Sequence, residues 1–192
     1  MTTTVQHICF FKYRLLKKVS GVVLLLLTLS VTFSHAQNST TGVNKLKAVF
    51  LFNFTRFIDW PESAFVSPES PFIIGILGGT PELNEYIEES VTGELVGTHT
   101  IIVQHYEDEN GPFNCQMLYI DLANSSKIRT ALTAVENHSI LTVSDAVDFN
   151  KYGGIIRFYT EEKKIRLQIN TDAAKSAQLN ISSKLLNLAK TK

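Results

Sequence analysis

Hydrophobic residues recur at helical spacing along the first segment that is predicted to fold. The apolar positions are Val43, Leu46, Val49, Phe50, Phe54 and Phe57. This spacing predicts a helix that ends at Trp60-Pro61, because a proline closes a helix. The segment is apolar on more than one side, so we expect packing on two sides, against the sheet and another element or a second subunit. A helix that is simply buried explains the pattern equally well.

Short apolar and β-branched runs further along the chain predict strands. These runs are residues 72–77, 98–106, 116–120 and 139–143. Helices are predicted for residues 81–91, capped by Thr80, and from Asn124 or Ser125 to Asn137. A hairpin and one or two short helices follow. This order predicts an α/β fold, a single domain with a central mixed β-sheet flanked by helices.

Alternation of apolar and polar residues predicts a β-hairpin from residues 155–160 and 164–169. Pairing Thr160 with Ile165 gives an apolar face of Ile156, Phe158, Ile165, Leu167 and Ile169. The opposite face then carries Arg157, Tyr159, Arg166, Gln168 and Asn170. The turn at residues 161–163 lacks an Asn-Gly or Gly-X signal, so the register rests on the alternation alone.

The N-terminus has the pattern of a secretory signal peptide. Basic residues precede an apolar run over residues 19–29, and Ser34-His35-Ala36 offers a small-residue cleavage site. The apolar run is too short to span a membrane comfortably, although an uncleaved anchor is the alternative. We therefore predict a leader at 1–36, a disordered polar segment at 37–42 and the folded domain at 43–192.

Cleavage of this leader changes the charge and the cysteine content. The leader holds 4 of the 18 basic residues and none of the 18 acidic ones, so the mature chain has 14 − 18 = −4. An acidic exported domain without a basic cluster is a poor candidate for nucleic-acid binding. Cys9 leaves with the leader, so Cys115 has no partner for an internal disulfide. A buried, inert thiol is the favoured interpretation of Cys115, and a reactive or intermolecular thiol is the alternative.

The polar face of the hairpin is the first candidate binding site. Guanidinium groups of Arg157 and Arg166, beside Tyr159 and Gln168, are suited to hold a carboxylate or phosphate. The alternative is a solvated sheet face, or arginines that pair with Asp or Glu from a neighbouring helix.

The first helix offers a second candidate site. Arg56 lies among aromatic residues that include Trp60, and a cation near aromatic rings is suited to an aromatic or anionic ligand or to a partner protein. The alternative is an ion pair between Arg56 and Asp59, three residues apart on the helix.

A loop bounded by Asp145 and the Gly153-Gly154 pair follows the last predicted strand before the hairpin. Asp145 is placed to cap the turn that starts the loop, and Gly153-Gly154 permits unusual backbone angles or a close backbone approach. Such a loop is either a recognition surface or an ordinary connection. Asn170 precedes Thr171 and Asp172, and we interpret it as a helix cap.

Motifs for catalysis, metal binding and cofactor binding are absent from the sequence. It contains no G-x-S-x-G, H-E-x-x-H or C-x-x-C, and Gly78-Gly79 lacks the further residues of a phosphate-binding loop. We therefore predict that the protein is not an enzyme, and we predict no metal and no cofactor.

Two segments resemble the YfiR-like family. Residues 141–189, LTVSDAVDFNKYGGIIRFYTEEKKIRLQINTDAAKSAQLNISSKLLNLA, resemble its LTV-x-D strand end, Gly-Gly pair, I-R-x-x-I-N strand and closing helix. Asp145, Gly153, Gly154 and Asn170 match that motif. Residues 45–61, KLKAVFLFNFTRFIDWP, resemble its opening helix.

The resemblance implies a periplasmic regulator without catalytic activity. Family members restrain a membrane-bound signalling enzyme, typically a diguanylate cyclase of the cyclic-di-GMP pathway. It thus implies a partner, the periplasmic sensor domain of an inner-membrane diguanylate cyclase or a histidine kinase, and a homodimer is a further prediction. The chain would not span the membrane after cleavage. Some family members carry disulfides, but a single mature cysteine gives no basis for redox control. The alternative function is a periplasmic module that binds a small aromatic or anionic ligand near Arg56 and Arg166.

Overall fold

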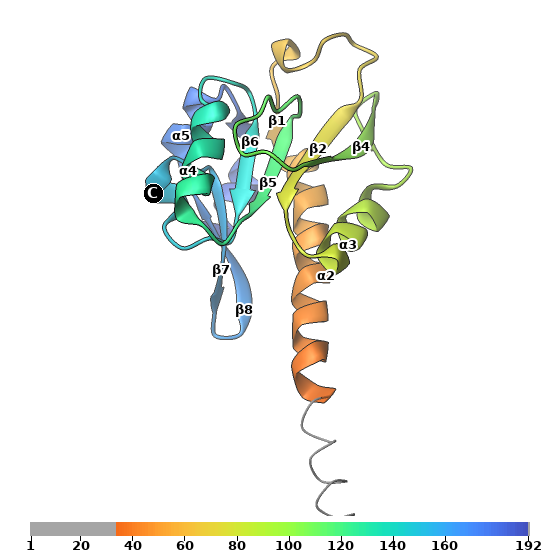
Figure 1. Cartoon of the computed structure of the whole chain (residues 1–192). Helices are drawn as coiled ribbons and strands as arrows, with labels where there is room; N and C mark the ends of the chain where they lie inside the picture. The colour runs from red at the N-terminus through yellow and green to blue at the C-terminus, as the bar shows by residue number, and fades with distance from the viewer. Residues whose placement is uncertain (1–33, 192) are drawn as a thin grey trace, which may run out of the picture. The chain divides into compact units, whose positions relative to one another are not determined.

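A computed structural model of the chain describes residues 34–191 (Figure 1). Most of the predicted leader therefore lies outside the described residues, and its cleavage stays a prediction. From Val43 onward the described residues form one compact unit, which confirms the predicted single α/β domain. The first described helix, α2 (Ser34–Phe57), also includes residues 37–42, for which the composition predicts a disordered segment. Adding turns to an existing helix costs far less free energy than starting a new one. The helix therefore continues through residues 37–42, although Gly42 weakens it.

Eight strands form a mixed sheet in the order β10-β8-β7-β6-β5-β2-β4-β3. Their bounds are β2 (Phe72–Gly78), β3 (Leu95–Val96), β4 (His99–Tyr106), β5 (Met117–Asp121), β6 (Leu141–Ser144), β7 (Ile156–Glu161), β8 (Lys164–Ile169) and β10 (Ala189–Thr191). The central strands β4, β2, β5, β6 and β7 run parallel. Strand β3 pairs antiparallel with β4 and β8 pairs antiparallel with β7, whereas β10 runs parallel to β8. A separate two-stranded ladder joins β1 (Ile58–Asp59) to β9 (Asn180–Ile181). The predicted strands of the core are confirmed, whereas the short strands β1, β3, β9 and β10 carry no sequence pattern that predicts them.

Side-chain caps begin the shorter helices as their sequences predict. Thr80 accepts a hydrogen bond from the Leu83 amide and begins α3 (Pro81–Val91), and Asn124 begins α4 (Ser125–Ala134). Asn170 and Ser182 begin α5 (Thr171–Ser176) and α6 (Ser183–Leu186) in the same way. The predicted capping role of Asn170 is therefore confirmed. No helix in the described part of the chain has the length and apolarity needed to cross a membrane.

The core divides between the two faces of the sheet. On one face, α2 and α3 pack on the strands, and Phe54 of α2 lies fully buried against Phe158 of β7. On the other face, α4 covers a cluster that includes Leu118 and Ile120 of β5. Alternate strand residues point to opposite faces, so the central strands β2 and β5 contribute to both clusters. Helices therefore flank the sheet, as predicted.

The hairpin β7–β8 has the predicted register. Ile156 pairs with Ile169 and Thr160 with Ile165, so the apolar face lies toward α2. The turn is one residue shorter than predicted, because Glu161 pairs with Lys164 and only residues 162–163 connect the strands. Both turn residues have positive φ, as a type I′ turn requires. Figure 1 shows the hairpin extending past the ends of the central strands.

Cys115 is a buried free thiol two residues before the start of β5. Its side chain packs in the cluster beneath α4. Burial raises the pKa of the thiol to about 12, so the reactive thiolate is scarce at neutral pH. The predicted burial is therefore confirmed.

Candidate functional site

The polar face of the hairpin brings four predicted site residues together. Arg157 lies opposite Gln168, and Tyr159 lies opposite Arg166. The structure adds Lys190, because β10 runs beside β8 and places Lys190 next to Gln168. The Lys190 ammonium lies 5.5 Å and the Arg157 guanidinium 5.9 Å from the centre of the Tyr159 ring.

Protein groups already engage the cations of this face. Arg157 Nε donates to the Ala146 carbonyl oxygen at 3.0 Å, and Arg166 Nε lies 3.9 Å from a Glu161 oxygen. Lys190 donates to the other Glu161 oxygen at 2.9 Å, and this hydrogen bond lowers the pKa of the Glu161 carboxyl. The partners of both arginines lie in the hairpin or in the loop after β6, so the alternative of carboxylates from a neighbouring helix is wrong. Anion binding at this face stays a prediction.

The structure places Arg56 and Trp60 away from the hairpin face and gives each a structural contact. Arg56 pairs with Glu94 at 3.5 Å and lies over the Phe52 ring, and its predicted pairing with Asp59 is wrong. The cause is that α2 ends at Phe57, so Asp59 belongs to β1 and accepts from Asn180 instead.

Trp60 closes the core rather than presenting a free ring. Its Nε1 donates to the Gln116 carbonyl oxygen at 2.9 Å, and its ring meets the edge of Phe72. Glu94, the partner of Arg56, directly precedes β3 at one edge of the sheet. Arg166 lies in β8 near the opposite edge. A single ligand site built from Arg56 and Arg166 is therefore not formed.

The loop after β6 is anchored at its start on both faces of the sheet. Asp145 pairs with Lys47 of α2 at 2.6 Å, on the face of the sheet that α2 covers. The carbonyl of the next residue, Ala146, accepts the hydrogen bond from Arg157 on the opposite face of the sheet. The turn is capped by Ser144, whose hydroxyl accepts from the Ala146 amide at 3.1 Å, so the predicted capping role of Asp145 is wrong. The longer reach of the Asp145 carboxylate takes it to α2 instead.

The two glycines at the end of the loop act as the sequence predicts. Gly153 has φ of 99°, and a side-chain carbon on Gly154 would lie 2.2 Å from the ring of buried Phe149. Buried Asn150 donates to the carbonyl oxygens of Gly154 and Ile155 and fixes the short helical turn η2 (Phe149–Tyr152). The loop is thus a fixed surface that exposes Val147, 71 % of which is accessible.

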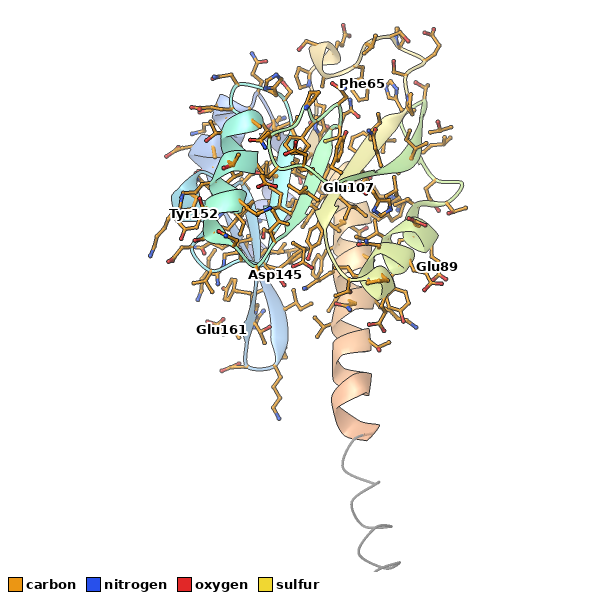
Figure 2. All side chains as sticks on the ribbon, in the orientation of Figure 1. Phe65, Glu89, Glu107, Asp145, Tyr152 and Glu161 are labelled. Atoms are coloured by element: carbon orange, nitrogen blue, oxygen red, sulfur yellow. The ribbon has the colours of Figure 1, made fainter. Side chains whose placement is uncertain are left out.

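A polar cluster at the carboxyl ends of β5 and β6 was not singled out from the sequence. Tyr119 and Asp121 are two residues apart on β5, and Asp145 directly follows β6, so all three point to the α2 face. Figure 2 shows Asp145 where the central strands end, at the base of the hairpin. The available signal was that Asp121 and Asp145 both follow buried strands, because parallel strands end at the same edge of a sheet.

Burial and charge perturb this cluster. Burial raises the pKa of the Asp121 carboxyl, and the nearby Asp145 carboxylate raises it further, whereas Lys47 lowers it. Tyr119 is fully buried, and its pKa is raised by burial and by the same two carboxylates. The Tyr119 hydroxyl has no hydrogen-bond partner among the described residues.

Replacing Asp121 by asparagine is expected to raise the free energy of unfolding at pH 7. A raised pKa means that the folded protein holds the Asp121 proton more tightly than the unfolded chain does. Stability therefore falls as the pH rises from the ordinary carboxyl pKa of 3.8 through the higher folded value. The gain in Asp121→Asn should be complete above that window and vanish below pH 3.8.

Urea unfolding of both proteins at pH 3 and pH 7 measures this gain. Glu107→Gln, a substitution at an exposed carboxylate, is the matched control and should change little at either pH. An equal gain at both pH values would show that ionisation of Asp121 is not its source.

An exposed apolar stripe runs along the outer side of α2. Val43, Leu46 and Val49 are 38 %, 43 % and 48 % accessible, whereas Ala48 and Leu51 on the opposite side are buried. The stripe follows helical spacing, so its members lie beside one another. The helix thus packs on the sheet with one side, and its outer side is apolar and uncovered. The alternative of a simply buried helix is therefore wrong.

Cavities lie elsewhere on the domain. One of about 360 Å³ opens between the end of α4 and α5, and another of about 320 Å³ lies beside Cys115 and Gln116. Neither cavity is lined by Arg56, Trp60 or a residue of the polar hairpin face. Among the described residues, no group of His, Cys, Asp and Glu side chains is arranged to hold a metal ion.

Residues 44–190 match the sequence profile of the YfiR/HmsC-like family, which covers nearly the whole compact unit. The chain belongs to the YfiR/HmsC-like family. This family is regulatory and its members act on diguanylate cyclases, so membership supports a regulatory role for this chain.

Comparison with solved structures gives a distant likeness to a conserved domain protein from Vibrio cholerae O1 biovar El Tor. The two share 14 % sequence identity at a TM-score of 0.46, and the match covers 62 % of this chain. The chain spans 54 % of the length of that structure. No curated protein matches this chain.

Proposed function

We propose that this YfiR/HmsC-like protein is an exported periplasmic regulator that binds the sensor domain of an inner-membrane signalling enzyme. The enzyme is a diguanylate cyclase or a related receptor such as a histidine kinase, and binding restrains it. Family membership over residues 44–190 is the observation that carries this proposal. The leader predicted at 1–36 supports export. The regulatory role of the family implies that the chain acts by binding rather than by catalysis.

The outer stripe of α2 is the surface that we assign to the partner. Val43, Leu46 and Val49 are exposed side by side on a helix whose other side is fixed in the core. Single exposed apolar residues are common, but a row of them on a rigid element is typical of a protein interface. A homodimer that uses the same stripe would compete with the partner.

The double substitution Leu46→Glu and Val49→Glu is expected to weaken partner binding at least tenfold, because two buried carboxylates would face the partner's apolar surface. The mature chain first serves as bait for envelope extracts, and mass spectrometry should identify a membrane protein with a periplasmic domain and a cyclase or kinase domain. Titration of its purified periplasmic domain with each variant then measures affinity.

Thr133→Glu, at an exposed position of α4, is the matched control and should bind as the unaltered chain does. Both substitutions lie on exposed positions, so thermal unfolding should show little change. Recovery of no such membrane protein would count against the proposed function. Unchanged affinity in the α2 variant would place the interface elsewhere.

A further inference from the structure

The cluster at the carboxyl ends of β5 and β6 contains two polar groups without partners. Tyr119 is fully buried, and its hydroxyl makes no hydrogen bond to any described residue. Asp121 is half-buried, and no hydrogen bond or ion pair joins its carboxylate to the described part of the chain. Buried polar groups in folded proteins are nearly always hydrogen-bonded, because water is lost without replacement otherwise. Tyr119 is such a group, and the unpaired carboxylate of half-buried Asp121 lies on the same side of the strand, so the pair points to a missing ligand.

The two groups face the same place. Tyr119 and Asp121 lie on the same side of β5, and the charge of Asp121 acts on the Tyr119 hydroxyl. The charge of Asp145, at the end of the adjacent strand, raises the pKa of both groups. Tyr119, Asp121 and Asp145 therefore lie on one face of the sheet where β5 and β6 end, and Figure 2 labels Asp145 there.

The charges of the cluster do not balance. Lys47 donates to Asp145 at 2.6 Å, and its side chain is only 12 % accessible, so its ammonium is already committed. Asp121 remains as a second carboxylate, which leaves one negative charge in a partly desolvated site. An unpaired charge in such a site is costly, and an added cation would remove that cost.

We propose that this cluster binds one organic cation, an alkylammonium or guanidinium group that donates hydrogen bonds to the Asp121 carboxylate and the Tyr119 hydroxyl oxygen. The group is carried by a small free amine or by a lysine or arginine side chain of a bound segment. The site shares only Val43 with the proposed partner surface, and its test requires no partner.

The neighbouring residues favour an organic cation over a metal ion. Divalent ions require several oxygen ligands, whereas the Lys47 ammonium beside Asp145 repels a divalent charge. Val43, the residue of the exposed stripe that lies one helical turn before Lys47, is 38 % accessible. An alkyl stem would contact Val43 while the charged end reaches Asp121.

Agmatine, which carries a guanidinium and an ammonium group, is the probe for this site. Calorimetric titration of the chain at low ionic strength should give saturable binding, and amide NMR signals of residues 119–122 and 145–147 should shift. Asp121→Asn should weaken binding at least tenfold, because it removes the unpaired charge. Tyr119→Phe keeps the buried ring and should weaken binding several-fold.

Two controls separate this site from general attraction of cations. Glu107→Gln removes an exposed carboxylate elsewhere and should leave the affinity unchanged. Tetramethylammonium carries the charge without N–H donors and should bind far more weakly than agmatine. The proposal is overturned if agmatine does not bind, or if it binds Asp121→Asn and Tyr119→Phe as well as it binds the unaltered chain.

Short acetylated peptides that contain one arginine distinguish the two sources of the cation. Competition between such a peptide and agmatine would assign the site to a side chain of a bound segment. Agmatine binding without peptide competition would assign it to a free amine. Either result leaves the proposed regulatory function standing, because that function fails only in the partner experiment.

Discussion

Replacing Phe54 by alanine should lower the free energy of unfolding by about 4 kcal/mol. Phe54 is fully buried, and its ring centre lies 5.9 Å from that of Phe158 and 6.3 Å from that of Phe50. The substitution removes the apolar contact that joins α2 to the hairpin and leaves a cavity between them. Urea unfolding followed by circular dichroism measures the loss.

Arg56→Ala is the matched control on the same helix. Arg56 is exposed, and its contacts with Glu94 and Phe52 lie at the surface, so the expected change is within about 0.5 kcal/mol. A loss below about 1 kcal/mol in Phe54→Ala would contradict the packing of α2 on the hairpin.

Replacing Gln116 by methionine is expected to lower the free energy of unfolding by about 3 kcal/mol, which is the second large effect. The Gln116 Oε1 accepts from the Ile73 amide at 2.7 Å, and its Nε2 donates to the Ala64 carbonyl oxygen at 2.6 Å. Methionine has a similar size and shape, so the substitution removes two partly buried hydrogen bonds with little change in volume. Two backbone groups would then be left unsatisfied.

Hydrogen exchange at the Ile73 amide distinguishes this cause from a general loss of packing. The amide should lose protection in Gln116→Met more than its neighbours in β2 do. Gln104→Met, at an exposed position of β4, is the control and should affect neither stability nor exchange at Ile73. Full protection of Ile73 in Gln116→Met would show that the side-chain hydrogen bond is dispensable.

Local patterns in the sequence predicted the parts of the fold that depend on neighbouring residues. Thr80, Asn124 and Asn170 cap helices because their short side chains reach the nearest free amides. The hairpin register followed from alternation, because a slip of one residue would turn every isoleucine away from the core. The turn itself was missed, since Glu162 and Lys163 adopt positive φ without an Asn-Gly signal.

The candidate site depended on strand order, which a single sequence does not contain. Asp121 and Asp145 lie far apart in the chain and meet because β5 and β6 are adjacent parallel strands. Lys47 joins them only through the packing of α2 on the sheet. The errors in the Arg56–Asp59 pair and in the predicted helix end at Trp60-Pro61 share another cause: the helix ends at Phe57, so spacing arguments fail beyond it.

The position of Cys115 gives this protein an internal reporter of its own unfolding. A chain cleaved after Ala36 carries this single thiol, and burial shields it from alkylating reagents. Under conditions where the core recloses faster than the reagent reacts, the labelling rate is proportional to the population of open molecules. The free energy of opening beneath α4 can thus be followed in envelope extracts, with no engineered label, as a partner or an amine is added.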